Sequence, residues 1–372
     1  MDTQEEKERI GTFQIGAVST IGHVTIDGKN TAVRLSSNEF YRFSKKEEGR
    51  IHGILTDHEK ITLIDCVTTS IPGSSSTPNG QSFHASVFPH YIATGTHHIE
   101  PEEQSVSAVE LVIENAHVLF WDHTAFGSSL ANREASRSFI TQLTSGKEEP
   151  PEIGDYPEIL YFTGKHQILS SLTSLGRIVV SHRPTFTSPS PKGLRVKNSI
   201  PIRIEFKTPL TFRDAFDRAY SLLVFVDLLM GVKHRIKGSA IELTTKAEDK
   251  MRLDVYQSMA PQSSGKKVFG RPHPGDVLIN GGLQPDSFST ALAAWLTRQA
   301  DWKNARFRFI QNFRKQNSYT VDRLVAAANL FDILPEGAVG AAPQISEDLA
   351  KATAEAKKRF RELPQTQERD SI

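Results

Sequence analysis

The 372-residue sequence contains a single cysteine, Cys66, which excludes an internal disulfide framework and fits a reducing cytoplasm. It also lacks a long apolar run. The most lipid-like stretch, residues 222–230, is nine residues long and contains Asp227, and this is about half the length needed to cross a bilayer. The first ten residues, MDTQEEKERI, are polar and acidic, whereas a signal peptide is basic and then apolar. We therefore predict a cytoplasmic protein without membrane association.

The composition is that of a folded soluble protein, with 38% hydrophobic and 23% charged residues and enough chain for two or three domains. The net charge of +1 hides an asymmetry. Residues 1–150 carry 12 Lys and Arg against 20 Asp and Glu, whereas the remainder carries 32 against 23. One interpretation is that a polyanion would meet the C-terminal part, and the other is that the charges are only scattered over solvated faces.

Alternating apolar residues predict a β-rich, mainly antiparallel N-terminal module over residues 10–145, arranged as a sandwich or a barrel. Its clearest element is IHGILTDHEKITLIDC, residues 51–66, in which two strand-like runs flank a polar turn and predict a hairpin. The period of two places Ile61 and Leu63 on one face, toward the core. The stretch TTSIPGSSSTPNGQS, residues 68–82, is rich in Gly, Pro and Ser and predicts an exposed excursion between strands.

A mixed strand–helix–strand region is predicted over residues 155–260, after a polar loop at residues 144–157 that we interpret as a subdomain boundary. Its helix begins at Thr211, with Asp214 completing a capping-box-like pair, and ends before Gly231. A Gly- and Pro-rich linker covers residues 261–286. Helical periodicity follows over residues 287–363, with a break expected near Asp301. The predicted class is α+β.

The order of these segments resembles a known family. IGHVTIDG, AVRL, IHGILTDHEKITLIDC, YFTGKHQILSSLTSLGRIVVSH, PIRIEFKTPLTFRDAFDRAYSLLVFVDLLMG and AIEL resemble the N-terminal region of ApeA-type proteins, and FSTALAAWLTRQADWKNARFRF and YTVDRLVAAANLFDIL resemble the start of the HEPN domain that follows it. The resemblance implies a prokaryotic antiviral protein that acts by abortive infection. In such proteins a sensing region controls a HEPN ribonuclease that cuts RNA, transfer RNA in some members.

The catalytic motif that the resemblance implies, R-x4-6-H, is missing from the helical segment, since no histidine follows His273. The literal match Arg177 to His182 lies in an expected strand, where a separation of five sends the two side chains to opposite faces. We therefore predict no catalytic residue and no cofactor in this chain. Whether the chain is an enzyme stays open, and the HEPN-like segment is interpreted as incomplete.

Two other patterns suggest ligand or metal binding. WDHTAFG offers a ring at Trp121 and polar groups at Asp122 and His123, which together predict a ligand pocket, although a strand-end Trp that closes a core explains the same pattern. Six histidines between His84 and His123 lack the spacing of a metal site, so we predict no bound metal and interpret them as loop or surface residues.

A basic stretch in the helical segment interleaves arginines with aromatic rings, as single-stranded RNA binding requires. The alternative is that the aromatics form the buried stripe of a helix while the exposed arginines guide a polyanion. The candidate nucleic-acid contacts are Arg298, Lys303, Arg306, Arg308, Arg314 and Lys315.

Two functional hypotheses follow. The first is the sensing region of an ApeA-type defence protein, with transfer RNA as a partner of the helical segment, a phage-derived protein or ligand as the trigger, and a homodimer formed through the helical segment. The second is a stand-alone β-rich binding module for a protein or small ligand, without catalytic activity. A reading frame that continues beyond codon 372 into helices with R-x4-6-H would favour the first.

Overall fold

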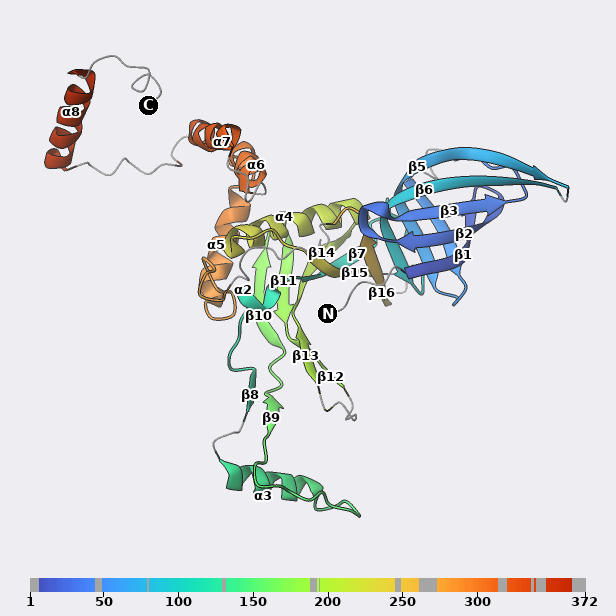
Figure 1. Cartoon of the computed structure of the whole chain (residues 1–372), viewed down its shortest axis with the longest axis horizontal. Helices are drawn as coiled ribbons and strands as arrows, with labels where there is room; N and C mark the ends of the chain where they lie inside the picture. Colours follow the sequence, from blue (N-terminus) through green and yellow to red (C-terminus); the bar gives the residue numbers. More distant parts are fainter. Residues whose placement is uncertain are drawn as a thin grey trace. The chain divides into compact units, whose positions relative to one another are not determined.

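The computed structural model groups the chain into two compact units, Met1–Thr297 and Arg298–Ile372. Strands dominate the first unit and helices form the second, which confirms the predicted α+β class (Figure 1). The residues that the structure describes are 7–43, 49–78, 80–128, 132–187, 193, 195–244, 249–260, 273–313, 320–335, 338 and 346–362.

Six strands at the start of the chain close into an antiparallel barrel. They are β1 (Lys7–Ile15), β2 (Val18–Ile26), β3 (Ala32–Ser37), β4 (Arg50–Leu55), β5 (Lys60–Thr77) and β6 (Gly80–Gly95), with the 3-10 turn η1 (Gly28–Asn30) between β2 and β3. Neighbours follow the order β1-β2-β3-β6-β5-β4, and β4 pairs back to β1. Of the two predicted arrangements, the structure therefore has the barrel.

The barrel interior is organised around the ring of Phe13, which is 1% exposed. Gly22 on β2 and Gly53 on β4 flank this ring: an added Cβ would lie 2.3 Å from it at Gly22 and 2.6 Å from it at Gly53. No real Cβ approaches another atom so closely, so only glycine leaves room for the ring. The large residue on β1 thus fits the small residues on its two neighbours, as close packing in a narrow barrel requires.

The predicted hairpin over residues 51–66 is confirmed as β4 and the start of β5, which pair in register. Ile61 and Leu63 are fully buried in the barrel core, as the period-2 alternation predicted. The turn is held to β1 from outside, because Arg9 bonds both Asp57 and Glu59 at 2.6 Å. The hairpin is therefore part of the scaffold.

The exposed excursion predicted at residues 68–82 is confirmed as exposed, but it does not lie between strands, because β5 and β6 continue through it as a two-stranded ribbon. The register shifts between Thr68 and Ser70 and again between Ser70 and Gly73. Pro72 falls inside the second shift, and a bulge tolerates a proline that a regular ladder excludes. The turn-like composition therefore marks bulges in an exposed ribbon.

A second antiparallel sheet continues from β6 in the order β6-β16-β15-β7-β14-β11-β10. β6 belongs to both structures, since residues 83–87 pair with β3 of the barrel and residues 91–95 pair with β16. The added strands are β7 (Val106–Ile113), β10 (Gln167–Thr173), β11 (Gly176–Ser181), β14 (Pro201–Leu210), β15 (Ile236–Thr244) and β16 (Lys250–Gln257).

Helix α4 (Phe212–Met230) packs on one face of this sheet, against β7 and β14. Its predicted start is confirmed: the Thr211 hydroxyl accepts from the Asp214 amide at 3.2 Å and donates to the Asp214 carboxylate at 2.7 Å. Gly231 ends the helix with a φ of 67°, as a C′ glycine does. Figure 1 shows α4 lying along the sheet, and its apolar stripe forms one core with the inward residues of the sheet.

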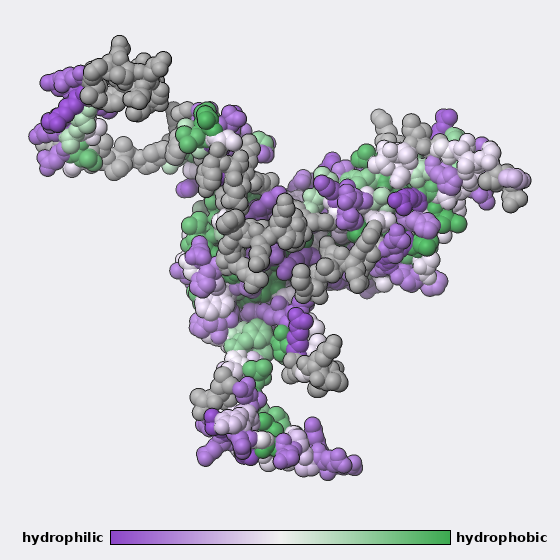
Figure 2. All heavy atoms as spheres, viewed as in Figure 1, coloured by the Kyte–Doolittle hydropathy of each residue, from purple (hydrophilic) through white to green (hydrophobic). Residues whose placement is uncertain are grey.

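The β-rich module predicted over residues 10–145 is interrupted after Ile113 by the short helix α2 (Ala116–Leu119). Farther along the chain, α3 (Arg133–Thr144) exposes the apolar side chains of Phe139 and Leu143, and Leu160 is also exposed. Figure 2 shows hydrophobic atoms at α3 among hydrophilic ones. The predicted loop at residues 144–157 lies inside the first unit. The remaining short elements are β8 (Phe126–Ser128), β9 (Leu160–Phe162), β12 (Arg183–Phe186) and β13 (Val196–Ser199).

The helices after the linker are α5 (Pro285–Thr297), α6 (Lys303–Phe313), α7 (Val321–Asp332) and α8 (Glu347–Glu362). The break near Asp301 is confirmed, since α5 ends at Thr297 and α6 begins at Lys303. Phe288 of α5 packs against Phe120 and Phe225 of the first unit, so this helix completes the core of that unit. No helix in the described ranges is long and apolar enough to cross a membrane.

Candidate functional site

The three residues predicted to line a ligand pocket, Trp121, Asp122 and His123, do not point the same way. Trp121 is 44% exposed and its ring lies 5.7 Å from that of His123, which is also exposed. Asp122 is buried. The alternative prediction was that Trp121 closes a core. The neighbouring Phe120 takes that core position instead and packs on Phe288. Ligand binding by this trio stays a prediction.

Asp122 is the centre of a polar cluster. Its Oδ2 lies 2.6 Å from Nζ of Lys165, and its Oδ1 accepts from the hydroxyl and the amide of Thr124 at 2.6 and 2.9 Å. Burial alone raises the pKa of Asp122, but the hydrogen bonds from Lys165 and Thr124 outweigh burial and hold the pKa well below its usual range. The carboxylate therefore joins the segment after α2 to the segment before β10.

His182, the histidine of the only R-x4-6-H match, borders this cluster. Its ring is buried, with the edges of Phe126 and Phe162 around it, and its Nε2 lies 3.9 Å from the Asp122 carboxylate. Burial lowers the pKa of His182, and the Lys165 charge adds to this against the pull of Asp122. Arg177, by contrast, is half exposed and lies near Glu205. The two residues thus occupy opposite faces and form no joint site, as the strand spacing predicted.

The basic residues predicted to bind RNA lie on and before α6. Arg298, Lys303 and Arg308 are exposed, whereas Arg306 is half-buried, and Arg314 and Lys315 lie outside the described residues. Burial lowers the pKa of Arg306, and the charge of Arg298 adds to this effect. The interpretation of the aromatics as a buried stripe is wrong for Phe307, which is 63% exposed. α6 therefore presents cations and an aromatic ring to solvent together.

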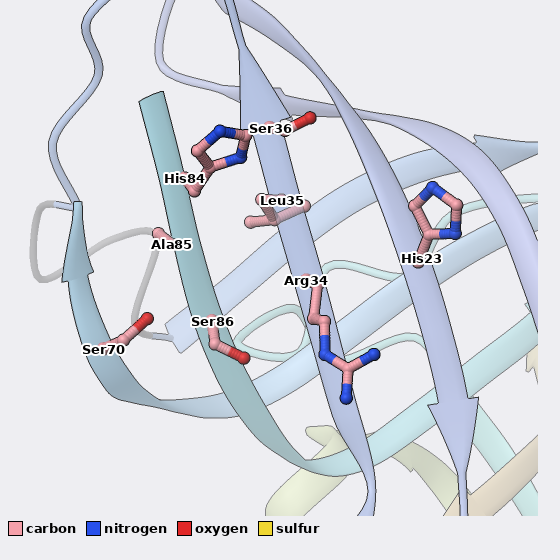
Figure 3. A pocket seen from close by; sticks show the side chains of 8 residues that line it. All are labelled: His23, Arg34, Leu35, Ser36, Ser70, His84, Ala85 and Ser86. Carbon is pink, nitrogen blue, oxygen red and sulfur yellow. The ribbon is translucent and has the colours of Figure 1, made fainter. Parts of the chain in front are cut away.

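A cavity that the sequence analysis missed opens on the outer face of the barrel (Figure 3). Its volume is about 350 Å³, within the range of small-molecule sites. It is lined by His23, Arg34, Leu35, Ser36, Ser70, His84, Ala85 and Ser86. Strand alternation indicated that the polar members face outward, but their register across four strands has no local sequence signal. Within the described ranges, no three His, Cys, Asp or Glu side chains cluster as a metal site.

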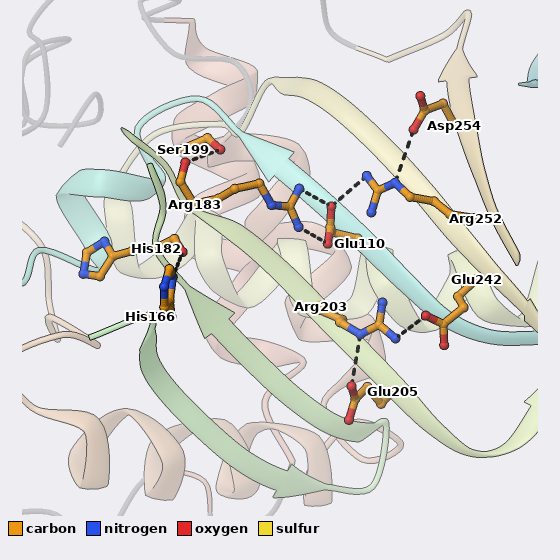
Figure 4. A network of polar contacts seen from close by, with 10 residues as sticks. All are labelled: Glu110, His166, His182, Arg183, Ser199, Arg203, Glu205, Glu242, Arg252 and Asp254. Carbon is orange, nitrogen blue, oxygen red and sulfur yellow. Dashed lines mark hydrogen bonds and ion pairs between the residues drawn. The ribbon is translucent and has the colours of Figure 1, made fainter. Parts of the chain in front are cut away.

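The sheet face that carries no α4 contacts holds a network of ion pairs (Figure 4). Glu110, a buried residue of β7, accepts two hydrogen bonds from Arg183, at 2.8 and 2.6 Å, and one from Arg252 at 2.9 Å. Burial alone raises the pKa of Glu110, but these hydrogen bonds outweigh burial and lower the pKa from 4.5 to about 2. The network thus gives the buried carboxylate of Glu110 two positively charged partners.

We predict that the Glu110 carboxylate makes stability depend on pH. Because folding lowers its pKa, its contribution is present above the unfolded pKa of 4.5 and is lost as the pH falls toward the folded value of about 2. From about pH 5 to about pH 3 the wild type should lose about 1–2 kcal/mol more than Glu110→Gln, allowing for the half-exposed arginines. Urea unfolding at the two pH values measures this difference. Glu205→Gln, in a more exposed pair, is the control, and equal pH dependence of wild type and Glu110→Gln would contradict the prediction.

Comparison with known proteins gives one match. The family model described as ApeA N-terminal domain 1 matches residues 8–295, a span that includes most of the barrel, the whole second sheet, α4 and nearly all of α5. No curated protein and no solved structure matches the chain. The family match covers well over half of the 372 residues and confirms the resemblance to the N-terminal region of ApeA-type proteins. The chain therefore belongs to the ApeA N-terminal domain 1 family.

Proposed function

We propose that this chain provides the sensing or regulatory region of a prokaryotic antiviral defence protein that acts by abortive infection in the cytoplasm. Membership of the ApeA N-terminal domain family indicates a role in an antiviral defence protein. The finer proposal rests on one observation. The family match ends at residue 295, and the first compact unit of the structure ends at nearly the same place, at Thr297. The part of this chain that the family model matches thus coincides with one compact unit.

The helical segment is proposed to be HEPN-like but without a complete ribonuclease site. HEPN chemistry needs an Arg and a His, the first to stabilise charge on the phosphate and the second to move a proton. No histidine follows His273 in this chain, and Arg177 and His182 lie on opposite faces. The trigger is proposed to be a phage-derived protein or ligand. A second copy is proposed to pair through the helical segment, where Val321 and Leu324 are exposed.

The antiviral role predicts that cells carrying the gene in its native context lower the plaquing efficiency of at least one phage in a diverse panel. Gly53→Val should abolish this protection, because a Cβ at Gly53 would lie 2.6 Å from the Phe13 ring and the barrel would not close. Plaquing efficiency relative to a strain without the gene measures the effect.

Gly73→Val is the matched control, since a Cβ at Gly73 meets nothing within 4 Å. It should protect as well as the wild type. Unchanged plaquing of every phage by the wild-type gene would contradict the antiviral role, and full protection by Gly53→Val would exclude the barrel from it.

The incomplete catalytic site predicts that the purified chain leaves total RNA intact. The measurement is incubation with total RNA followed by gel electrophoresis, with His182→Ala in parallel. Cleavage by the wild type that is lost in His182→Ala would show that His182 is catalytic despite its buried ring. Cleavage by both proteins would reveal an active centre elsewhere.

RNA binding is the second candidate activity, favoured by the exposure of Phe307 beside Lys303 and Arg308 on α6. Cations on one helix contact phosphates, and an exposed ring stacks on a base, without a preference for sequence. This surface suits weak binding of a single-stranded or looped RNA such as transfer RNA.

We expect the affinity for a labelled transfer RNA to fall steeply between about 50 and about 200 mM salt, because phosphate contacts release counterions. The double variant Lys303→Glu and Arg308→Glu should weaken binding further, as measured by fluorescence anisotropy. Lys29→Glu, which changes an exposed lysine of the barrel, is the control and should bind as the wild type does. Equal binding by the double variant would exclude α6 as the contact surface.

A further inference from the structure

The barrel cavity brings polar side chains from four strands onto one outward row. β-sheet register places His23 beside Arg34, Arg34 beside Ser86, and Ser86 beside Ser70. The next row pairs Ser36 with His84. Figure 3 shows Arg34 and Ser86 toward one end of the cavity and Ser36 and His84 toward the other. The floor between the rows is formed at Leu35 and Ala85, whose side chains belong to the barrel core.

Arg34 differs from Arg9 and Arg50 of the barrel in its surroundings. Arg9 bonds Asp57 and Glu59, and Arg50 pairs with Glu100 and Glu102. The guanidinium of Arg34 has no hydrogen bond or ion pair to any residue that the structure describes, and no Asp or Glu lines the cavity. An exposed cation without a protein counter-ion, inside a cavity, is an arrangement that attracts an anion.

The other lining groups suit the oxygens of a phosphate. Arg presents several N–H donors in a planar fork that binds phosphate through two parallel hydrogen bonds. Serine hydroxyls and imidazole N–H groups supply further donors around the same space. His84 is already oriented, because its Nε2 lies 3.0 Å from the Ser82 hydroxyl and 3.3 Å from that of Ser75. A donor set with one cation and no carboxylate matches an oxyanion.

The charge of the surrounding region selects a small anion over a polyanion. Residues 7–95, which span the barrel strands, carry 9 Lys and Arg against 8 Asp and Glu, so the cavity is not part of a basic stretch such as an extended nucleic acid needs. A small ligand that places one phosphate beside Arg34 meets only the local cation. The volume of about 350 Å³ accommodates a phosphate with part of an organic group attached.

We infer that this cavity is a binding site for the phosphate group of a small phosphorylated molecule, with Arg34 as the principal contact. The site goes beyond the proposed function, because it rests on the barrel geometry alone and can be tested without phage or RNA. The phosphate comes either from inorganic phosphate or from a phosphorylated metabolite such as a nucleotide.

The test is isothermal titration calorimetry of the purified chain with three probes: inorganic phosphate, AMP and adenosine. We expect heat from phosphate or AMP and none from adenosine. Stronger binding of AMP than of phosphate would assign the site to phosphorylated metabolites, and equal binding would assign it to the phosphate group itself. Absence of binding for both phosphate and AMP up to about 10 mM, which corresponds to a very weak affinity, would overturn the proposal.

Variants locate the binding. Arg34→Gln should lower the affinity at least about tenfold, the size expected when a charge-assisted hydrogen-bonding pair is lost, and Arg34→Lys should lower it less because the charge remains. Arg42→Gln, which removes another exposed arginine of the barrel region, should bind like the wild type. Since Arg34 is exposed, its variants are expected to keep the wild-type melting temperature. Undiminished binding by a folded Arg34→Gln would overturn the proposal.

Discussion

The ribbon of β5 and β6 is the constraint on which the first unit depends, because β6 is hydrogen-bonded into the barrel and into the second sheet. Pro89 lies between the β6 residues that pair with β3 and those that pair with β16. Pro89 pairs with Cys66 of β5. The residue before Cys66, Asp65, has a φ of 50°, and Nδ1 of His90 donates to the Asp65 carbonyl at 2.6 Å. The two strands therefore bend together where they pass from one structure to the other, and the barrel and the sheet share one backbone ladder.

The two faces of the second sheet are stabilised by different interactions. Toward α4 it presents Ile202, Ile204 and the other apolar residues of the core, whose burial drives folding. The opposite face places Glu110 in the middle of β7, where a lone carboxylate would be costly. Arg183 and Arg252 offset that cost by forming ion pairs with the carboxylate, and each keeps about half of its side chain in solvent. Ion pairs thus let a central strand carry a buried charge.

Exposed basic side chains occur at two separate places, on the barrel and on α6. On the barrel, Arg34 stands in a cavity and its neighbours in the register are His23 and Ser86, so it suits a small anion. On α6, Lys303 and Arg308 lie in the basic part of the chain and Phe307 is exposed between them, so they suit an extended polyanion. The two surroundings differ in charge, because the α6 cations lie in the basic part of the chain, whereas residues 7–95 carry 9 Lys and Arg against 8 Asp and Glu.

Local patterns in the sequence determined the hairpin of β4 and β5, the start and end of α4 at Thr211 and Gly231, and the helix break near Asp301, because alternation, capping and loss of periodicity act over a few residues. The order of these segments also identified the family. Only the tertiary structure decided that the strands close into a barrel, since the pairing of β4 with β1 joins strands distant in sequence. It likewise turned the Gly- and Pro-rich residues 68–82 into a bulged ribbon, and it placed Arg34 in a cavity, because register between strands depends on long-range packing that no local pattern encodes.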